Sequence, residues 1–159
     1  MSSGTVLAIY ITSIHGQSTR PIDAVRVVPG MGLEGDRYFG PAGMQGKRSG
    51  SGRDLTLIEM EALDALEIEI GLHLDPGEAR RNLVTRGVAL NDLVGREFKV
   101  GAVTLRGVRL CEPCSYLAGM TDARVLPGLI HRAGLRADIV TEGIIAAGDP
   151  ISIPSPEMP

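Results

Sequence analysis

The sequence predicts a mainly β fold of the α+β class: an antiparallel β-barrel with one long helix and short peripheral helices. Short apolar segments punctuated by glycine are typical of strands joined by tight turns. Only one segment shows extended helical periodicity. Hydrophobic residues make up 43% of the 159 residues, enough to build a core. Because no repeat or linker divides the chain, we expect a single domain over residues 1–159.

The strands are expected where β-branched and apolar residues run between turn residues. They are Thr5–Ile11, Asp23–Gly30, Asn82–Thr85, Glu97–Val100, Val103–Leu110, Ala137–Val140, Gly143–Ala146 and Pro150–Ile153. The alternation of apolar and polar residues shifts at Gly107, which predicts a bulge or bend. The glycine-rich segment Gly32–Asp54 is expected to be a long loop that could fold over a bound ligand.

The long helix is predicted over Leu57–Ile70. Thr56 and Glu59 have the spacing of a capping box, and Gly71 is a plausible C-terminal stop. A short helix is expected over Pro127–Gly134, because proline favours the first helical position and glycine favours the end. The short helix is expected to be peripheral to the barrel.

The basic residues are mostly arginines. Of 16 lysines and arginines, only Lys47 and Lys99 are lysines. The guanidinium group is a planar fork of donors that matches phosphate and carboxylate. Clusters at Glu78–Asn82 and His131–Ala137 point to an anion site, and a plain charged surface stays the alternative on the residues alone. Nucleic acid is not expected as a partner, since the net charge is −3 and aromatic residues make up only 3% of the chain.

The chain carries no sign of membrane insertion or secretion. No apolar run reaches the ~18 residues that a bilayer demands. The N-terminal residues lack the basic start of a signal peptide, and two cysteines do not make a secreted disulfide scaffold. We therefore expect a cytoplasmic protein in a reducing compartment, with no membrane partner.

Cys111 and Cys114 form a C-x-x-C pair that several chemistries would suit. Structural zinc requires four ligands, but only His15, His73 and His131 are available and none forms a second paired motif. A thiol–disulfide switch and two buried small residues are further alternatives. A thiolate at a strand end would instead suit a soft metal. These alternatives stay open on the residues alone.

Three motifs in order resemble the MOSC domain: "GLEGDRY" (Gly32–Tyr38), "RRNLVTRGVALNDLVGREFKVG" (Arg80–Gly101) and "LCEPCSYL" (Leu110–Leu117). The similarity runs from Val6 to Ile153, and the chain is similar to the small stand-alone bacterial type. The domain takes its name from the C-terminal part of molybdenum cofactor sulfurases. It also occurs in mitochondrial amidoxime-reducing components. The resemblance implies a β-barrel that binds a molybdopterin-type cofactor.

The resemblance also implies site residues. Cys114 matches the cysteine tied to molybdenum or to sulfur transfer, as catalytic residue and metal ligand, while Cys111 would be auxiliary. Asp36 and Arg37 match a "GDR" element that many relatives follow with histidine; here Tyr38 follows it. The other cofactor-binding residues that the resemblance implies are Arg80, Arg81, Asn82, His131, Arg132 and Arg136.

Two classes of function follow. A molybdenum cofactor protein would be either a sulfur or cofactor carrier or a reductase of N-hydroxylated compounds. The chain has no pyridoxal phosphate domain and no flavin, haem or iron–sulfur motif, so a reductase would need a separate electron-transfer protein, and a carrier would need a molybdoenzyme. The alternative is a cofactor-free thiol redox or interaction module that uses Cys111 and Cys114.

Overall fold

The computed structural model describes residues 2–14, 16–41 and 51–154. Its main sheet has eight strands in the order β11-β7-β8-β9-β5-β6-β1-β2, and pairing of β11 with β1 closes it into a barrel from which β2 projects. The strands are β1 (Ser2–Ile11), β2 (Arg20–Ile22), β5 (Leu55–Glu59), β6 (Leu83–Arg86), β7 (Glu97–Val100), β8 (Val103–Leu110), β9 (Leu135–Ile139) and β11 (Pro150–Ser152). A second sheet has the order β10 (Gly143–Ala146), β3 (Ala24–Val28) and β4 (Gly32–Leu33). The predicted β-barrel is confirmed.

One pair of strands departs from the predicted antiparallel pattern. β5 and β6 are parallel, with Leu57 opposite Leu83. Between them the chain passes through α1 (Met60–Ile70) and a short 3₁₀ helix, η2 (Pro76–Ala79). Parallel neighbours require such a crossover, because a tight turn can only join antiparallel strands. The long helix is therefore the connection that sets these two strands side by side.

The long helix begins later than its sequence predicts. Thr56 and Glu59 belong to β5, so they form no capping box, and the helix starts at Met60 rather than Leu57. Buried Leu57 faces the barrel interior, and this burial in the sheet outweighs the local helical signal. The predicted end is confirmed: Gly71 adopts a left-handed conformation, and its N–H donates to the helix.

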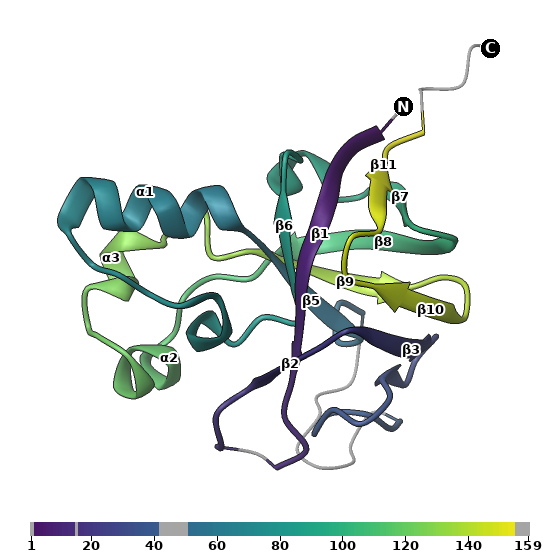
Figure 1. The fold of residues 1–159 in the computed structure, drawn as a ribbon, viewed down its shortest axis with the longest axis horizontal. Coiled ribbons are helices and arrows are strands. Elements are labelled where there is room, and N and C mark those ends of the chain that lie inside the picture. Colours follow the sequence, from purple (N-terminus) through teal and green to yellow (C-terminus); the bar gives the residue numbers. More distant parts are fainter. Residues whose placement is uncertain (1, 15, 42–50, 155–159) are drawn as a thin grey trace.

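The remaining helices are short: α2 (Ser115–Met120), α3 (Val125–Gly128) and the 3₁₀ helix η3 (Leu90–Leu93). The helix predicted over Pro127–Gly134 is wrong, since α3 ends at Gly128. His131 has a φ of 61°, which a right-handed helix excludes. In Figure 1, α1, α2 and α3 gather on one side of the barrel. Among the described residues, no helix is long and apolar enough to span a bilayer.

The core has two layers that share strands β5 and β6. Leu57 and Leu83 point into the barrel interior. Their neighbours Ile58 and Val84 point outward and pack with Leu66 of α1. Successive residues of a strand face opposite sides, so each strand serves both layers. Burying one such side chain contributes about 1.5–3 kcal/mol to folding, which fixes the helical layer on the barrel.

The bulge predicted at Gly107 is confirmed. The register between β8 and β9 shifts between Gly107 and Arg109. A Cβ on Gly107 would collide with the carbonyl oxygen of Leu93, so only glycine lets η3 approach the strand. Beyond the bulge, β8 runs on to Leu110 and delivers the cysteine segment at its end.

Candidate functional site

A pocket of about 180 Å³ lies where several strand ends meet the cysteine segment. It brings together residues that are far apart in the sequence. Seven of the nine predicted site residues line it: Asp36, Arg37, Arg80, Arg81, Asn82, Cys114 and Arg136. His131 and Arg132 are not in its lining. Segments separated by up to 100 residues thus build one site.

The pocket lining is strongly basic. The arginines in it are Arg37, Arg53, Arg80, Arg81 and Arg136, and the acids are Asp36 and Asp54. Among the described residues of the lining, five positive charges against two negative ones leave a net charge of +3, in a chain whose own net charge is −3. Like charges at close range repel each other, so such a concentration favours the binding of an anion.

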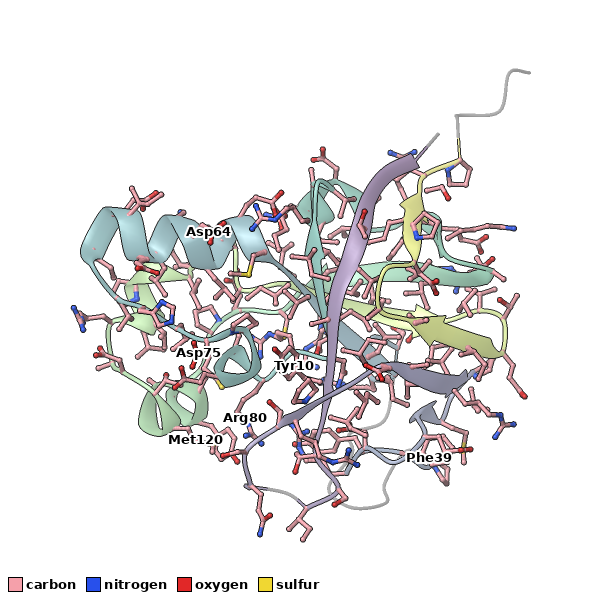
Figure 2. The ribbon with its side chains drawn as sticks, in the orientation of Figure 1. Tyr10, Phe39, Asp64, Asp75, Arg80 and Met120 are labelled. Atoms are coloured by element: carbon pink, nitrogen blue, oxygen red, sulfur yellow. The ribbon has the colours of Figure 1, made fainter. Side chains whose placement is uncertain are left out.

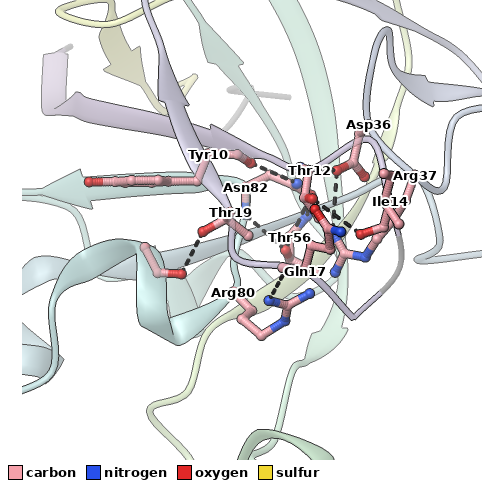
Figure 3. Close-up of polar contacts among 11 residues, drawn as sticks. Tyr10, Thr12, Ile14, Gln17, Thr19, Asp36, Arg37, Thr56, Arg80 and Asn82 are labelled. Carbon is pink, nitrogen blue, oxygen red and sulfur yellow. Dashed lines mark hydrogen bonds and ion pairs between the residues drawn. The ribbon is translucent and has the colours of Figure 1, made fainter. Parts of the chain in front are cut away.

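Asp36 and Arg37 form a buried pair at the base of the site (Figure 3). Arg37 Nη1 donates to Asp36 Oδ1 over 3.2 Å, and each residue is 8% exposed. The same carboxylate oxygen accepts the backbone N–H of Thr12. The Nε of Arg37 is buried, with no hydrogen-bond partner among the described residues. Asp36 therefore fixes the guanidinium of Arg37, whose Nε–H remains an unused donor within the described chain.

Arg80 sits in an unusual backbone conformation. It follows η2 with a φ of 58°, in the left-handed region that side chains with a Cβ rarely adopt. Its Nη1 donates to the carbonyl oxygen of Gln17 over 2.7 Å. Its Nε and Nη2 are buried, with no partner in the described part of the chain. Burial, followed by the positive charge of Arg37, lowers the pKa of Arg80. A bound anion would offset both the cost of burying the charged guanidinium and its repulsion by Arg37.

Arg81, although adjacent, plays a different part. Its Nε donates to the carbonyl oxygen of Ala133 over 2.8 Å. Its Nη2 donates to the carbonyl oxygens of Cys111 and Glu112 over 3.3 and 3.4 Å. The side chain is 8% exposed. Arg81 thus holds the cysteine segment against the turn that precedes β9.

Asn82 also makes structural contacts (Figure 3). Its Oδ1 accepts hydrogen bonds from the backbone N–H and the hydroxyl of Thr56, and its Nδ2 donates to the carbonyl oxygen of Tyr10. These bonds join β1, β5 and the start of β6. One N–H of the amide remains for a ligand.

The two cysteines differ in accessibility. Cys114 is exposed and directly precedes α2, whereas Cys111 is 2% exposed and its backbone N–H donates to the carbonyl oxygen of Gly134. Both line the pocket. Arg136, on β9, lines it from another side, opposite Thr56 in the strand register. Cys114 is therefore the thiol that a ligand in the pocket could reach.

His131 and Arg132 are engaged outside the pocket. The ring Nδ1 and the backbone N–H of His131 contact the carboxylate of Glu112 at 2.7 and 2.6 Å. Arg132 makes a two-pronged contact with Glu69 of α1 at 2.7 and 3.2 Å. The structure thus gives both residues contacts that fix the turn carrying them. Their role in binding a cofactor stays a prediction.

Sequence reasoning missed several pocket residues, among them Tyr38, Arg53, Thr56 and Tyr116. Tyr38 lies under the guanidinium of Arg37 at 4.4 Å, and Tyr116 lies 5.8 Å from that of Arg80. Both tyrosines lie inside recognised motifs, Gly32–Tyr38 and Leu110–Leu117, so the motifs could have found them. Arg53 lies in the glycine-rich segment without a distinguishing pattern. Residues 42–50 of that segment lie outside the described residues.

The lining suits an anionic group. Among the described residues there is no cluster of three or more His, Cys, Asp or Glu side chains that could hold a metal ion alone. The unpartnered donors of Arg37 and Arg80 fit a phosphate.

Comparisons with known proteins bear on the fold and the family. A search of curated protein sequences finds no match. Among solved structures, the chain is similar to YuaD of Bacillus subtilis, with a TM-score of 0.79 and 16% identity over 93% of each chain. It is similar to YiiM of Geobacillus stearothermophilus, with a TM-score of 0.68 and 18% identity over 96% of this chain and 75% of the other. YiiM of Escherichia coli has a TM-score of 0.67 and 20% identity over 96% and 71%. A family model described as the MOSC domain matches residues 38–152, so the chain belongs to the MOSC domain family.

Proposed function

We propose that this protein binds a molybdopterin-type molybdenum cofactor in the arginine-lined pocket, with Cys114 as the protein ligand to the metal. One observation carries the proposal. The pocket combines an exposed thiol with a surplus of three positive charges and with buried guanidinium donors that lack partners in the described chain. A terminal phosphate and a soft metal would use these two features.

The arginines of the pocket divide into two groups in this proposal. Arg37, Arg80 and Arg136 bind the phosphate, because the first two carry unused buried donors and the third lines the pocket from β9. Asp36 orients Arg37 by accepting from its Nη1. Arg81 positions the segment that carries Cys114 by holding its backbone carbonyls.

The cofactor, when bound, would supply redox chemistry that removes oxygen from N-hydroxylated compounds. As a carrier, the chain would instead deliver sulfur held on Cys114, or the cofactor itself, to another enzyme. The chain contributes binding, orientation and the thiolate. Because that thiolate must stay reduced, the proposal places the protein in the cytoplasm. A reductase would draw electrons from a separate electron-transfer protein, and a carrier would dock on a molybdoenzyme.

The test is cofactor content. The chain and its Cys114→Ala variant are produced without oxygen in a host that makes molybdopterin. Metal is measured by mass spectrometry, and pterin by fluorescence after oxidation. Near-stoichiometric metal and pterin in the wild type, with metal lost from Cys114→Ala, are expected. Absence of pterin from both proteins would refute stable cofactor binding and leave a transient carrier or the thiol module.

A loaded protein then distinguishes the two forms of the proposal. A reductase oxidises a chemical electron donor only when an N-hydroxylated compound is present, and Cys114→Ala abolishes this turnover. A carrier shows no such turnover but activates a cofactor-free molybdoenzyme on mixing. The cofactor-free thiol module gains no specific support here, because Cys111 is buried and is poorly placed for thiol exchange.

A further inference from the structure

A second and larger pocket adjoins the first. It has a volume of about 500 Å³, within the range of small-molecule sites in proteins. It lies between the C-terminal end of β1, η2 and the end of α2, where Figure 2 shows Tyr10, Asp75, Arg80 and Met120 near one another. Arg80 lines both pockets. A molecule in the larger pocket would thus lie next to the proposed cofactor site.

Two hydroxyl groups in this pocket, those of Thr19 and Thr121, can act only as acceptors. Thr19 Oγ1 donates its hydrogen to the carbonyl oxygen of Gly77 over 2.6 Å, and Thr121 Oγ1 donates to that of Leu117 over 2.7 Å. A hydroxyl has one hydrogen to give, so each oxygen has only lone pairs left for a ligand. Figure 3 shows the bond made by Thr19. A ligand that meets these oxygens must bring its own donors.

Two carboxylates, those of Asp75 and Glu78, add further hydrogen-bond acceptors to this pocket. Asp75 and Glu78 line the pocket and cap η2 reciprocally, each carboxylate accepting a backbone N–H. His73 Nε2 contacts Asp75 Oδ1 at 2.8 Å and offsets part of its charge. Glu78 has no ion pair among the described residues, so its negative charge remains available at the pocket. Arg80 is the one cationic residue among the described residues that line this pocket.

The other walls offer flat apolar surface. Tyr10, Pro21, Pro76 and Met120 line the pocket, and the methionine side chain adapts readily to the shape of a ligand. Gly77 packs closely on the ring of Tyr10, since a Cβ there would lie 2.9 Å from Cε1. The backbone of η2 thereby holds the aromatic ring in place. These walls fit the faces of a planar molecule.

We propose that this larger pocket is the substrate site and that it selects planar compounds rich in N–H or O–H donors, neutral or cationic, over carboxylates. The donors of the ligand face Thr19, Thr121 and Glu78. Arg80, which lines both pockets, lies between the substrate and the other two phosphate-binding arginines, Arg37 and Arg136. The assignment of this ligand as the substrate rests on the proposed function, whereas the binding preference does not.

The experiment is a titration of the cofactor-free chain, followed by nuclear magnetic resonance of its backbone amides. The probes are phenylguanidine, which is planar with several N–H donors, and benzoate, which is similar in size with only acceptors. Phenylguanidine should shift the amides of Thr19, Gly77 and Thr121 and bind about tenfold more tightly than benzoate. Benzoate binding at equal affinity, or shifts confined to the Cys114 pocket, would overturn the proposal.

A matched pair of variants tests the charge. Glu78→Gln keeps the cap of η2, because glutamine serves at that position too. It should weaken phenylguanidine binding about two- to fivefold, the range for one exposed charge. Glu97→Gln, on β7 and outside both pockets, should leave the affinity unchanged. Equal affinity in both variants would show that Glu78 makes no such contact and would refute the selection of cations.

The phenylguanidine titration and the measurement of cofactor content can fail independently of each other. A chain that binds phenylguanidine but never acquires pterin would retain the donor-selective pocket and lose the assignment of a substrate. A chain that acquires metal and pterin but does not bind phenylguanidine would keep the proposed function and refute this inference alone.

Discussion

Arg81 Nη2 donates a hydrogen bond to the carbonyl oxygen of Cys111 over 3.3 Å, so the start of β6 holds the cysteine segment directly. The same guanidinium reaches Ala133 and Glu112. Sequence similarity implies a ligand-binding arginine at this position. The geometry makes it the residue that positions Cys114.

Replacing Arg81 with alanine should lower the free energy of unfolding by about 2–3 kcal/mol. The change leaves buried carbonyl oxygens without a donor and removes charge-assisted bonds. Arg81→Lys should recover little, because an ammonium group cannot reproduce the planar fork. The free energies of unfolding of both variants are measured by denaturant titration, with circular dichroism as the signal.

The control for Arg81 is Arg106→Ala. Arg106 pairs with Glu97 at 3.1 Å on an exposed face of the barrel. Its loss should lower the free energy of unfolding by less than about 1 kcal/mol. Equal effects in Arg81→Ala and Arg106→Ala would mean that the contacts of Arg81 do not hold the segment.

The left-handed conformation of Arg80 predicts a difference between two truncations. Arg80→Gly and Arg80→Ala both remove the guanidinium, but only glycine adopts a φ of 58° without strain. The glycine variant should therefore be about 1 kcal/mol more stable than the alanine variant. Chemical denaturation compares the two proteins. Equal stabilities would show that the backbone at this position is not strained.

His73 should make stability depend on pH in the alkaline range. Hydrogen bonds with Glu67, and then with Asp75, raise the pKa of His73 from 6.5 to about 9. The folded state therefore binds the proton more tightly than the unfolded state. This stabilisation is fully present below pH 6.5 and is lost as the pH rises through 9. His73→Gln should unfold more easily than the wild type at pH 6, and the difference should vanish at pH 10. A pKa near 6.5 for the His73 ring, measured by nuclear magnetic resonance titration, would contradict the prediction.

The two thiols should react at different rates. Cys114 is exposed and Cys111 is 2% exposed. Iodoacetamide should therefore alkylate one thiol of the native protein quickly, and both only after unfolding. Cys114→Ala should remove the fast phase, as mass spectrometry of the intact chain would show. A fast phase that survives in Cys114→Ala would place the accessible thiol at Cys111.

The barrel strands were predictable because their signals are local. Glu97–Val100 and Val103–Leu110 alternate clearly across a tight turn, and the structure has both strands with these bounds. The segment Leu55–Glu59 misled the prediction because its apolar residues fit a helix as well as a strand. Its pairing with β6 and β9 decides the outcome, and those partners lie far along the chain.

The motifs predicted several of the residues that line the site. They did not predict what each residue does there. Arg80 and Arg81 are neighbours of the same type, and the pattern treats them alike. The left-handed turn at Arg80 sends one guanidinium toward the pocket and the other toward Ala133 and Cys111. The larger pocket escaped prediction because its acceptor pattern depends on hydrogen bonds such as that of Thr19 with Gly77, 58 residues away.

The measurement that tests the central claim most directly is the pterin content per chain when the phosphate-binding arginines are changed. Wild type, Arg106→Ala and the double variant Arg37→Ala/Arg80→Ala are produced together in a host that makes molybdopterin. The account predicts near-stoichiometric pterin in the wild type and in Arg106→Ala, with at least about a tenfold loss in the double variant. A folded double variant that retains its pterin would contradict the account.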